Sequence, residues 1–361
     1  MPGLAQPLRI LMPNETDRQY VSELIFGRWR SQIAYAAVEL RVLENLSVNI
    51  PRSAEDVASK IGARDALILY RLMRAVASIG LADEDAHHRF VISPAGQMLL
   101  PDHPQSLQAM LLLEEGPAHY AIWKHLPAIV RDGVQDGFSR EYGMPVFDYL
   151  KENENYARVF QQAMSNYSAN EALSVCTALQ RNVTWHVESI CDVGGGDGSL
   201  LAEVLKIFPH SRGIVLDLPE VVAQRQHSAK ARSSDDGRLR HVGGNMFDAV
   251  PNADLYLVKH VLHDWDDAEC RKILQTLRAS ALASSRLYIS EMVVPPPHER
   301  HFSKIFDMHM LCASTGKQRT ISEFAQLLSN SGWTLEELLP ADDSPLRLIA
   351  AKVSDETLTV T

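Results

Sequence analysis

The sequence predicts an α/β fold, in which helices cover both faces of a parallel sheet, preceded by a mostly helical N-terminal region. Two observations lead to this prediction. After Val187, short apolar runs alternate with amphipathic segments, which is the pattern of strands joined by helical crossovers. The first apolar run ends in a cluster of glycines between Gly194 and Gly198, where Rossmann-like sheets hold a nucleoside.

The N-terminal region has the element order of a winged helix. Apolar residues recur at helical spacing over 14–48 and 66–79, and Ser53 is a candidate cap for a helix between them. Gly80 follows the last helix in the usual C-terminal position, and residues 81–92 read as a hairpin. Helix, helix, helix and hairpin in this order predict a winged-helix-like unit.

Two further segments complete the predicted organisation. Residues 106–180 keep a helical pattern that glycines interrupt, and residues 181–361 hold the alternating pattern. The predicted domains are therefore 1–105, 106–180 and 181–361. Strands are expected at 189–193, 212–216, 239–243, 254–258, 286–291 and 346–353, and helices at 199–207, 219–230, 266–282 and 322–331.

Composition argues against several classes of function. The chain has 361 residues, of which 46% are hydrophobic and 22% charged, a globular mixture. Its formal net charge of -10 disfavours nucleic acid, whose phosphates need clustered Lys and Arg. No window approaches about 18 continuous apolar residues and the N-terminus lacks a signal-peptide core, so no membrane partner is expected. Four cysteines without a C-x-x-C pair favour a reducing, cytoplasmic location.

The glycine cluster distinguishes between two kinds of cofactor. Asp192 is followed by Gly194, Gly196 and Gly198, which gives the pattern D-x-G-x-G-x-G. A dinucleotide fingerprint is G-x-G-x-x-G, and counted from Gly194 its last glycine would fall on Ser199. An NAD-dependent dehydrogenase is therefore the weaker alternative. A plain glycine-rich turn that holds no ligand is the other alternative.

Polar residues follow the next two predicted strands. Asp217 closes the second strand, where a carboxylate can accept both ribose hydroxyls or cap the following helix. Asn245 and Met246 follow two glycines after the third strand. A polar group beside an apolar one suits the edge and face of an adenine ring, and a simple left-handed turn explains the same residues equally well.

A polar run beyond the fourth strand is the best candidate for catalysis. The strand ends near Lys259, and His263 lies just beyond it, where catalytic groups in open α/β sheets gather. An imidazole titrates near pH ~6.5, so His263 is the best general base in the chain, although a lone histidine is often structural. Glu291 ends the following strand and either fixes the imidazole tautomer or stands in solvent. His298 and His301 lack further ligands, so no metal is predicted.

Five motifs, in order, resemble those of the S-adenosylmethionine (SAM) dependent small-molecule O-methyltransferases, and the similarity covers nearly the full length. That family includes caffeic acid and hydroxyindole O-methyltransferases and bacterial tailoring enzymes for phenazines and polyketides. The motifs are Asp192-Val193-Gly194-Gly195-Gly196, Leu216-Asp217-Leu218-Pro219, Gly244-Asn245-Met246-Phe247, His263-Asp264-Trp265-Asp266-Asp267 and Gly316-Lys317-Gln318-Arg319-Thr320.

The resemblance implies a SAM-binding catalytic domain, a dimerisation domain at the N-terminus and connecting helices that line a substrate pocket. It implies SAM without a metal, a homodimer and a small aromatic substrate that carries a hydroxyl. The residues implied to bind the cofactor are Ser168, Asp192, Gly194, Gly196, Asp217, Asn245, Met246, Phe247 and Lys259; the catalytic ones are His263 as base, Glu291 and Gln318; and Met164, Met310 and Asp264 would contact the acceptor.

Two positions depart from the family pattern. The family usually has Asp where this chain has Asn245, whose amide carbonyl can still accept from the adenine amino group. Plant members often carry Glu where Gln318 stands, and a neutral partner gives the imidazole less help. The predicted activity is methyl transfer from SAM to a hydroxyl. Methylation of nitrogen or carbon on the same scaffold, and a regulator that binds DNA through the winged-helix-like segment, are alternatives.

Overall fold

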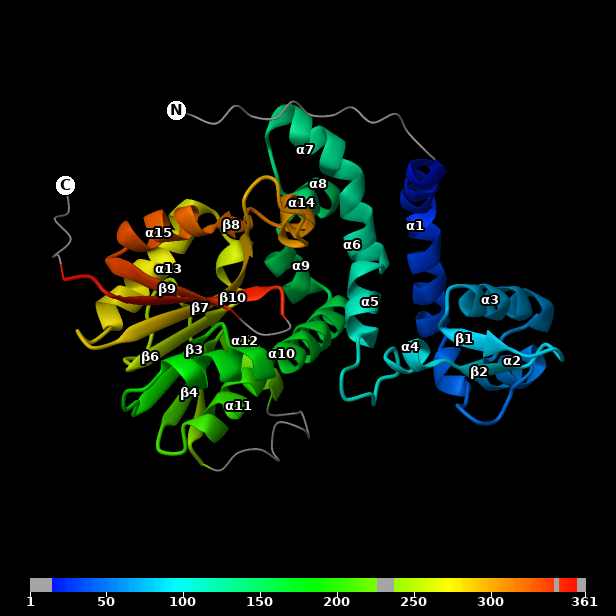
Figure 1. The fold of residues 1–361 in the computed structure, drawn as a ribbon, viewed down its shortest axis with the longest axis horizontal. Coiled ribbons are helices and arrows are strands. Elements are labelled where there is room, and N and C mark those ends of the chain that lie inside the picture. Colours follow the sequence, from blue (N-terminus) through cyan, green and yellow to red (C-terminus); the bar gives the residue numbers. More distant parts are fainter. Residues whose placement is uncertain (1–14, 226–236, 341–343, 356–361) are drawn as a thin grey trace. The chain divides into compact units, whose positions relative to one another are not determined.

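The structure is a computed structural model that describes residues 15–225, 237–340 and 344–355 (Figure 1). The chain divides into two compact units, Met1–Gly116 and Pro117–Thr361. Nothing here tests the predicted three-part division, which stays a prediction. Within the described ranges, no helix is both long and apolar enough to cross a membrane.

The N-terminal unit contains the three helices and the hairpin that the sequence predicts. Ser53 caps α2, because its hydroxyl accepts from the N–H of Asp56 and the Asp56 carboxylate accepts from the N–H of Ser53. Fully buried Phe90 of β2 shares a core cluster with Val57 and Met73. The elements are α1 (Glu15–Glu39), η1 (Leu43–Asn45), α2 (Ala54–Ile61), α3 (Ala66–Ser78), β1 (Ala82–Glu84), β2 (Phe90–Ile92), α4 (Pro94–Gln97) and α5 (Gln108–Glu114).

The C-terminal unit begins with helices and continues as an alternating α/β region. Its first elements are α6 (Pro117–Ile122), η2 (Trp123–His125), α7 (Leu126–Asp132), α8 (Gly137–Tyr142), α9 (Val146–Glu152) and α10 (Glu154–Asn182). There follow β3 (Ser189–Val193), α11 (Ser199–Ile207), β4 (Arg212–Asp217), α12 (Pro219–Arg225), β5 (Leu239–Gly243), β6 (Leu255–Lys259), η4 (Leu262–Asp264), α13 (Asp267–Ser280), β7 (Arg286–Val294), α14 (Ser303–Ala313), β8 (Arg319–Thr320), α15 (Ile321–Ser329), β9 (Trp333–Pro340) and β10 (Leu346–Val353).

All predicted strands are present, each within a few residues of its expected bounds. The predicted helix 219–230 is described only as far as Arg225, and the rest lies outside the described residues. Strands β8 and β9 were not predicted. The sequence therefore predicts the parallel half of the sheet better than its C-terminal edge.

Strand order places a crevice between β3 and β6. The sheet runs β5-β4-β3-β6-β7-β10-β9, and β8 pairs with β7 beside this path. The strands from β3 to β7 are parallel, and β10 is antiparallel to both neighbours. Because the order along the chain reverses between β3 and β6, ligands are expected at the carboxyl ends of these two strands.

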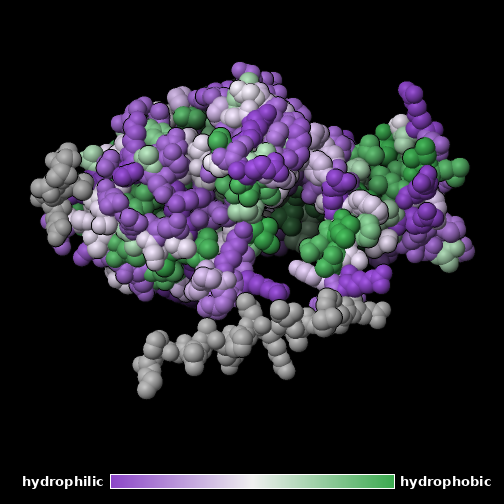
Figure 2. All heavy atoms as spheres, turned by 90° about the horizontal axis from the view of Figure 1, so that it is seen from above, coloured by the Kyte–Doolittle hydropathy of each residue, from purple (hydrophilic) through white to green (hydrophobic). Residues whose placement is uncertain are grey.

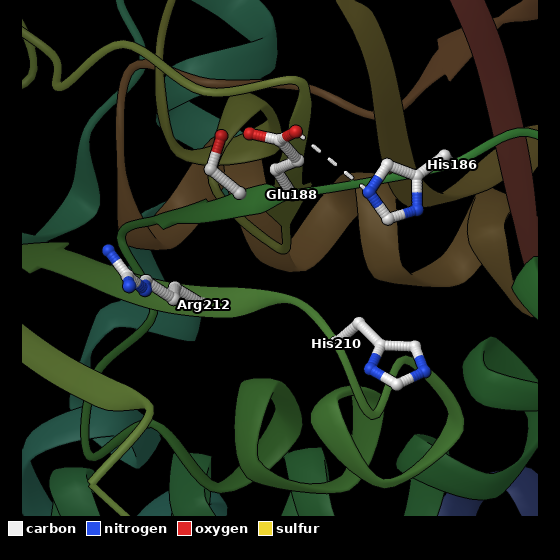
Figure 3. A pocket seen from close by; sticks show the side chains of 5 residues that line it. His186, Glu188, His210 and Arg212 are labelled. Atoms are coloured by element: carbon white, nitrogen blue, oxygen red, sulfur yellow. Dashed lines mark ion pairs between the residues drawn. The ribbon is translucent and has the colours of Figure 1, made fainter.

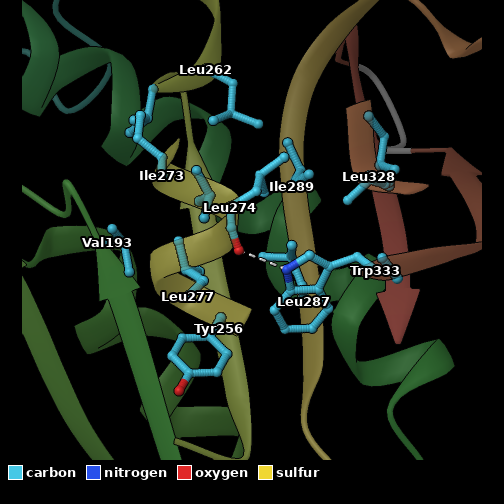
Figure 4. Packing of buried hydrophobic residues seen from close by; sticks show 14 of the residues in the cluster. Val193, Tyr256, Leu262, Ile273, Leu274, Leu277, Leu287, Ile289, Leu328 and Trp333 are labelled. Carbon is cyan, nitrogen blue, oxygen red and sulfur yellow. Dashed lines mark hydrogen bonds between the residues drawn. The ribbon is translucent and has the colours of Figure 1, made fainter. Parts of the chain in front are cut away.

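Helices cover both faces of this sheet, as predicted. On one face, Cys191 and Val193 of β3 share a core cluster with residues of α13 and α15, where the indole N–H of Trp333 donates to Leu274 O at 2.9 Å (Figure 4). On the other face, Ile190 of β3 packs with residues of α10 and α11. This alternation along one strand fixes which side chains remain at its end.

Candidate active site

The polar residues predicted from the sequence lie at one edge of the sheet. Asp192 and Asp217 are at the carboxyl ends of β3 and β4, Lys259 ends β6, and Glu291 lies in the second half of β7. His263 is in η4, directly after β6. Parallel strands end at the same edge, so side chains that are far apart in the sequence meet here.

The glycine turn after β3 leaves backbone exposed beside Asp192. Gly194 and Gly196 have φ angles of 72° and 58°, which favour glycine. A Cβ on Gly194 would lie 2.7 Å from Cγ2 of Val261, so the turn approaches the segment after β6 closely. A Cβ on Gly196 would meet nothing within 4 Å. A ligand can therefore reach the main chain at Gly196.

Asp192 is a buried carboxylate with an unused oxygen. The residue is only 2% exposed, and Oδ2 of its side chain has no hydrogen-bond partner among the described residues. Burial raises the pKa of Asp192 to about 7; nearby Asp217 and Asp197 act in the same direction, and Lys259 opposes them. Leaving a buried acceptor unpaired costs free energy, so this oxygen is suited to accept from a ligand.

Asp217 ties the glycine turn to the end of β4. Its Oδ2 accepts from the N–H of Gly196 at 2.8 Å, and its Oδ1 accepts from the N–H of Leu218 at 2.7 Å. Burial raises the pKa of Asp217, although both hydrogen bonds act to lower it. In the free protein this carboxylate supports the turn, and its predicted contact with a ribose stays a prediction.

The turn after β5 also has a structural role of its own. Oδ1 of Asn245 accepts from the N–H of Phe247 at 3.0 Å, the arrangement that a polar turn residue is expected to make. Met246 and Phe247 pack against the core, and the Phe247 ring meets Trp265 edge to face at 4.9 Å. The predicted adenine contacts of Asn245, Met246 and Phe247 stay predictions.

His263 and Glu291 form a buried hydrogen-bonded pair. Nδ1 of His263 donates to Oε2 of Glu291 at 2.8 Å, and the backbone N–H of His263 lies 3.3 Å from Oε1 of the same carboxylate. Glu291 therefore fixes both the turn and the imidazole tautomer, which leaves Nε2 as the proton acceptor. Oδ1 of Asp264 lies 3.6 Å from this Nε2.

Charges around the pair shift its titration strongly. Burial lowers the pKa of His263, but the carboxylates of Glu291 and Asp264 outweigh it and raise the value to about 9. Burial raises the pKa of Glu291, yet His263 and His260 together hold it well below its usual range. Burial also raises the pKa of Asp264, to about 6. The site thus concentrates acidic groups around one imidazole.

The loop before β8 packs closely against the turn that carries His263. A Cβ on Gly316 would lie 1.8 Å from the carbonyl oxygen of His263, so only glycine fits there. Gln318 is buried, and neither atom of its amide has a partner among the described residues. Its backbone N–H donates to Asp307 at 2.7 Å. The amide of Gln318 is thus held inside the fold with its hydrogen-bonding capacity unused.

Aromatic rings border His263 on the side of α14. Phe306 meets the imidazole edge to face, with ring centroids 5.7 Å apart. The Phe306 ring also stacks on the His309 ring, with centroids 5.3 Å apart and an interplanar angle of 15°. Of the residues predicted to contact the acceptor, Met310 is buried in this helix and Met164 is half-buried in α10.

A second group of polar side chains joins α10 to the end of β6. Nζ of Lys259 donates to Oγ of Ser168 at 3.1 Å and to Glu171 at 2.8 Å. Nε2 of His260 lies 2.9 Å from the same oxygen of Glu171. Ser168 and Lys259, both predicted to contact the cofactor, are hydrogen-bonded to each other. Glu171 and His260 were missed, because their partners lie far away in the sequence and no motif marks them.

Arg319 is another residue whose role the sequence did not reveal. It is 1% exposed, and its guanidinium donates to Leu262 O at 2.7 Å, to Trp265 O at 2.8 Å and to the Asp267 carboxylate at 2.9 Å. These two carbonyls flank His263. Arg319 therefore holds the turn that carries His263 in place, through the planar fork of donors that only arginine offers.

A pocket of about 430 Å³ lies at the opposite edge of the sheet (Figure 3). Ser189 and Arg212 at the starts of β3 and β4 line it, together with His186, Glu188 and His210. Nε2 of His186 lies 3.9 Å from Glu188, and both side chains are exposed. This pocket is at the amino ends of the strands and shares no residue with the candidate active site.

Family models match most of the chain. A model described as an O-methyltransferase domain matches residues 123–334, and one described as an O-methyltransferase dimerisation domain matches residues 22–102. The chain is also similar to a phenazine O-methyltransferase, PhzM, of Lysobacter antibioticus. The two are 33% identical over 331 residues, which is 91% of this chain and 94% of that protein.

Solved structures agree with this match. The chain resembles the crystal structure of LaPhzM with a TM-score of 0.87 and 32% identity, over 93% of this chain and 99% of that one. It also resembles CalO1, a methyltransferase of calicheamicin biosynthesis solved in its S-adenosylhomocysteine-bound form. There the TM-score is 0.79 and the identity 26%, over 95% of this chain and all (100%) of that one.

These matches favour the methyltransferase prediction over the dehydrogenase alternative. The α/β unit carries the catalytic domain, and the N-terminal helices carry the domain named for dimerisation. The chain belongs to the O-methyltransferase family and is an enzyme that uses SAM to methylate a small molecule.

Proposed function

We propose that the chain methylates a hydroxyl of a small aromatic metabolite, with His263 as general base. The observation that carries this proposal is the 2.8 Å hydrogen bond from Nδ1 of His263 to buried Glu291. It keeps the proton on Nδ1, so that Nε2 can take the proton of an acceptor. Asp264, beside Nε2, would help to orient the acceptor hydroxyl.

The residues around the glycine turn fit SAM. Oδ2 of Asp192 is a buried acceptor without a partner, and Gly196 leaves its backbone open, as a cationic nucleoside with amino groups requires. Asp217 offers a carboxylate at the end of the second strand, and Asn245, Met246 and Phe247 border the third. Gly194, Ser168 and Lys259 complete the set on the side of α10.

The chemistry needs one proton transfer and one displacement. Bound SAM supplies a methyl carbon that the neighbouring sulfonium makes electrophilic. Nε2 of His263 takes the proton of a phenol, whose pKa is about 10, as the oxygen forms its bond to the methyl carbon. The bond from that carbon to sulfur breaks at the same time, its electron pair stays on sulfur, and S-adenosylhomocysteine leaves. Glu291 stabilises the resulting imidazolium. Because the pKa of His263 is raised, the neutral base grows more abundant toward pH 9, and the rate should rise over that range.

An aromatic acceptor suits the surroundings of His263. The edge of Phe306 lies against the imidazole, and its face continues as a stack onto His309. Flat apolar surfaces of this kind favour a planar ring, and Met164 and Met310 are adaptable neighbours for one. Gln318, buried with an unused amide, would help to hold His263 or the acceptor.

Replacing the base tests the proposal. His263→Gln should lower kcat by roughly 10²–10⁴-fold and leave SAM affinity nearly unchanged, because the side chain acts on the acceptor. Isothermal titration with SAM and a mass-spectrometric methylation assay measure the two. His125→Gln is the matched control, since His125 also pairs with a carboxylate, Glu141, at 2.7 Å. Near-normal turnover in the His263 variant would refute the base assignment.

We further propose that the reaction needs no metal. His260, His263 and Glu291 bring potential ligand atoms within 4.8 Å of one another, but Oε2 of Glu291 and Nδ1 of His263 already satisfy each other. Activity should therefore survive dialysis against EDTA, with the dialysed protein checked by elemental analysis. Loss of activity that added divalent metal restores would contradict this proposal.

A homodimer is the third part of the proposal. Large apolar side chains on several sides of α1 are exposed in the N-terminal unit, where Figure 2 shows hydrophobic residues gathered on the surface. They are Tyr20, Val21, Leu24, Ile25, Phe26 and Trp29, and together they form an apolar patch. Patches of this kind usually mark interaction sites, and a second copy would bury this one. All four cysteines are buried free thiols, which suits a cytoplasmic protein.

A further inference from the structure

We propose that His260 is a positioning residue, a second imidazole that bridges Glu171 and Glu291 and thereby controls how firmly His263 holds its proton. Neither the motifs nor the family resemblance assigns this residue a role. The effect on proton binding is a property of the folded protein by itself. Only its consequence for the rate rests on the proposed function.

His260 lies within hydrogen-bond distance of Glu171 and within ion-pair distance of Glu291. Nε2 of His260 lies 2.9 Å from Oε2 of Glu171, and Nδ1 lies 3.8 Å from Oε2 of Glu291, the atom that also accepts from His263. The two imidazole rings are 5.2 Å apart. The side chains of His260 and Glu171 are 10% and 8% exposed, so water screens these contacts poorly.

Each ring nitrogen of His260 faces a carboxylate. A neutral imidazole has one N–H, so one ring nitrogen would face a carboxylate with a lone pair. With a proton on each nitrogen, the ring offers a donor to Glu171 and another toward Glu291. Nδ1 has no hydrogen-bond partner among the described residues, which leaves it available for Glu291.

The backbone is adapted to this placement. His260 has a φ of 53°, a left-handed conformation that few residues other than glycine adopt. Its N–H donates to Ser290 O at 3.2 Å, which holds the residue beside Glu291 on the neighbouring strand. Unusual backbone conformations persist where the surroundings enforce them, and here they set an imidazole between two carboxylates.

The charges that face His260 come from four elements. From α10 there are Glu171 and the ring of Tyr167, whose centroid is 5.2 Å from the imidazole. Lys259 of β6 also contacts Glu171, with its Nζ 2.8 Å from Oε2 of that carboxylate. Glu291 of β7 and His263 with Asp264 of η4 complete the set. His260 thus acts on Glu291, whose pKa it helps to lower and which in turn raises the pKa of His263.

Removing His260 should therefore make His263 hold its proton to higher pH. Without the neighbouring ring, Glu291 presents its full negative charge to His263, and any repulsion between two imidazolium rings disappears. The test variant is His260→Asn, because asparagine tolerates the left-handed backbone and carries no charge. His88→Asn is the matched control, since exposed His88 has a φ of 57° and belongs to the N-terminal unit.

The measurement follows the histidine Cε1 resonances of the SAM-free protein, labelled with ¹³C in histidine, as pH is varied. In His260→Asn, the midpoint of His263 should move upward by on the order of one pH unit, and in His88→Asn it should stay in place. A midpoint that is unchanged or lower in His260→Asn overturns the proposal.

A rate measurement separates this inference from the proposed function. If His263 is the base, the alkaline rise of kcat/KM for the acceptor should move upward in His260→Asn together with the His263 resonance, while KM for SAM changes little. If the resonance moves and the rate profile does not, the bridge stands and the base assignment fails.

Discussion

Single residues in this site hold buried charge that the fold alone does not require. Within the described part of the chain, Asp192 and Glu171 each keep one oxygen without a partner, and both amide atoms of Gln318 lack one. Buried polar atoms of this kind are rare in folded proteins because each costs free energy. We propose that bound SAM and acceptor molecules pair with these three residues, which would offset that cost.

The cost of one such group is measurable. Asp192 has a pKa of about 7 in the folded protein against about 3.9 in an unfolded chain, so folding is penalised as pH rises from 4 through 7, and the penalty is complete above 7. Asp192→Asn should therefore stabilise the SAM-free protein by about 2–4 kcal/mol at pH 8 and by little at pH 4. It should also weaken SAM binding.

Urea denaturation at the two pH values and titration with SAM test this prediction. Ser211→Ala serves as a control for a buried polar residue outside the site, because it should destabilise equally at both pH values. If Asp192→Asn is no more stable than the wild type at pH 8, the carboxyl is ionised at little cost and our description of its burial is wrong.

Residues with a local signature could be predicted from the sequence, and those with distant partners could not. Asp192, Asp217 and His263 follow recognisable strands and loops, so their meeting at one sheet edge was foreseeable. The partner of His260 on α10 is 89 residues away, and the carbonyl of Leu262 is 57 residues from Arg319. No spacing rule connects such pairs before the fold is known.

At the scale of elements, the position of the turn that carries His263 depends on the segment 314–320. Gly316 touches the backbone of His263, and Arg319 donates to carbonyls on both sides of it. Strand β8, which carries Arg319, is only two residues long, and β9 shows no clean alternation of buried and exposed residues. Neither strand has the continuous buried run that marks β3 and β4, which explains why the sequence pattern missed both.

Removing the Arg319 side chain should impair catalysis more than SAM binding. Arg319→Met leaves two buried carbonyls with fewer donors, and we expect a loss of about 2–4 kcal/mol of stability. The freed turn should lower kcat at least tenfold at a temperature where the variant is folded, with KM for SAM nearly unchanged, and steady-state kinetics with circular dichroism measure both.

Arg286→Met provides the comparison. Arg286 also donates to two carbonyls and pairs with a carboxylate, but it lies at the start of β7, whereas Arg319 lies beside the end of that strand. If both variants lose stability and neither loses kcat, Arg319 supports the fold alone and does not position His263.

At the scale of the whole molecule, the chain joins a catalytic domain to a domain named for dimerisation. Helical periodicity and strand alternation predicted two kinds of fold, and the resemblance to the O-methyltransferase family implied what each domain does. The apolar patch of α1 is the largest run of apolar residues that the N-terminal unit leaves uncovered in the described part of the chain. Its exposure is costly for a lone copy, and pairing would remove that cost.

Light scattering tests whether this patch pairs two copies. Leu24→Glu combined with Ile25→Glu should halve the molar mass measured at micromolar concentration, because both side chains are more than 60% exposed in the single chain. Val130→Glu, at an equally exposed apolar residue of α7, should leave the mass unchanged. A wild-type protein that is already monomeric would contradict the dimer.

The proposed role of His263 is tested most directly with a series of phenols of decreasing pKa, assayed at one pH in the wild type and in His263→Gln. A base is needed only while the phenol keeps its proton. We predict that the variant is roughly 10²–10⁴-fold slower with phenols of pKa near 10 and approaches the wild-type rate with phenols that are already ionised. The same loss of rate across the whole series would contradict the assignment of His263 as the base.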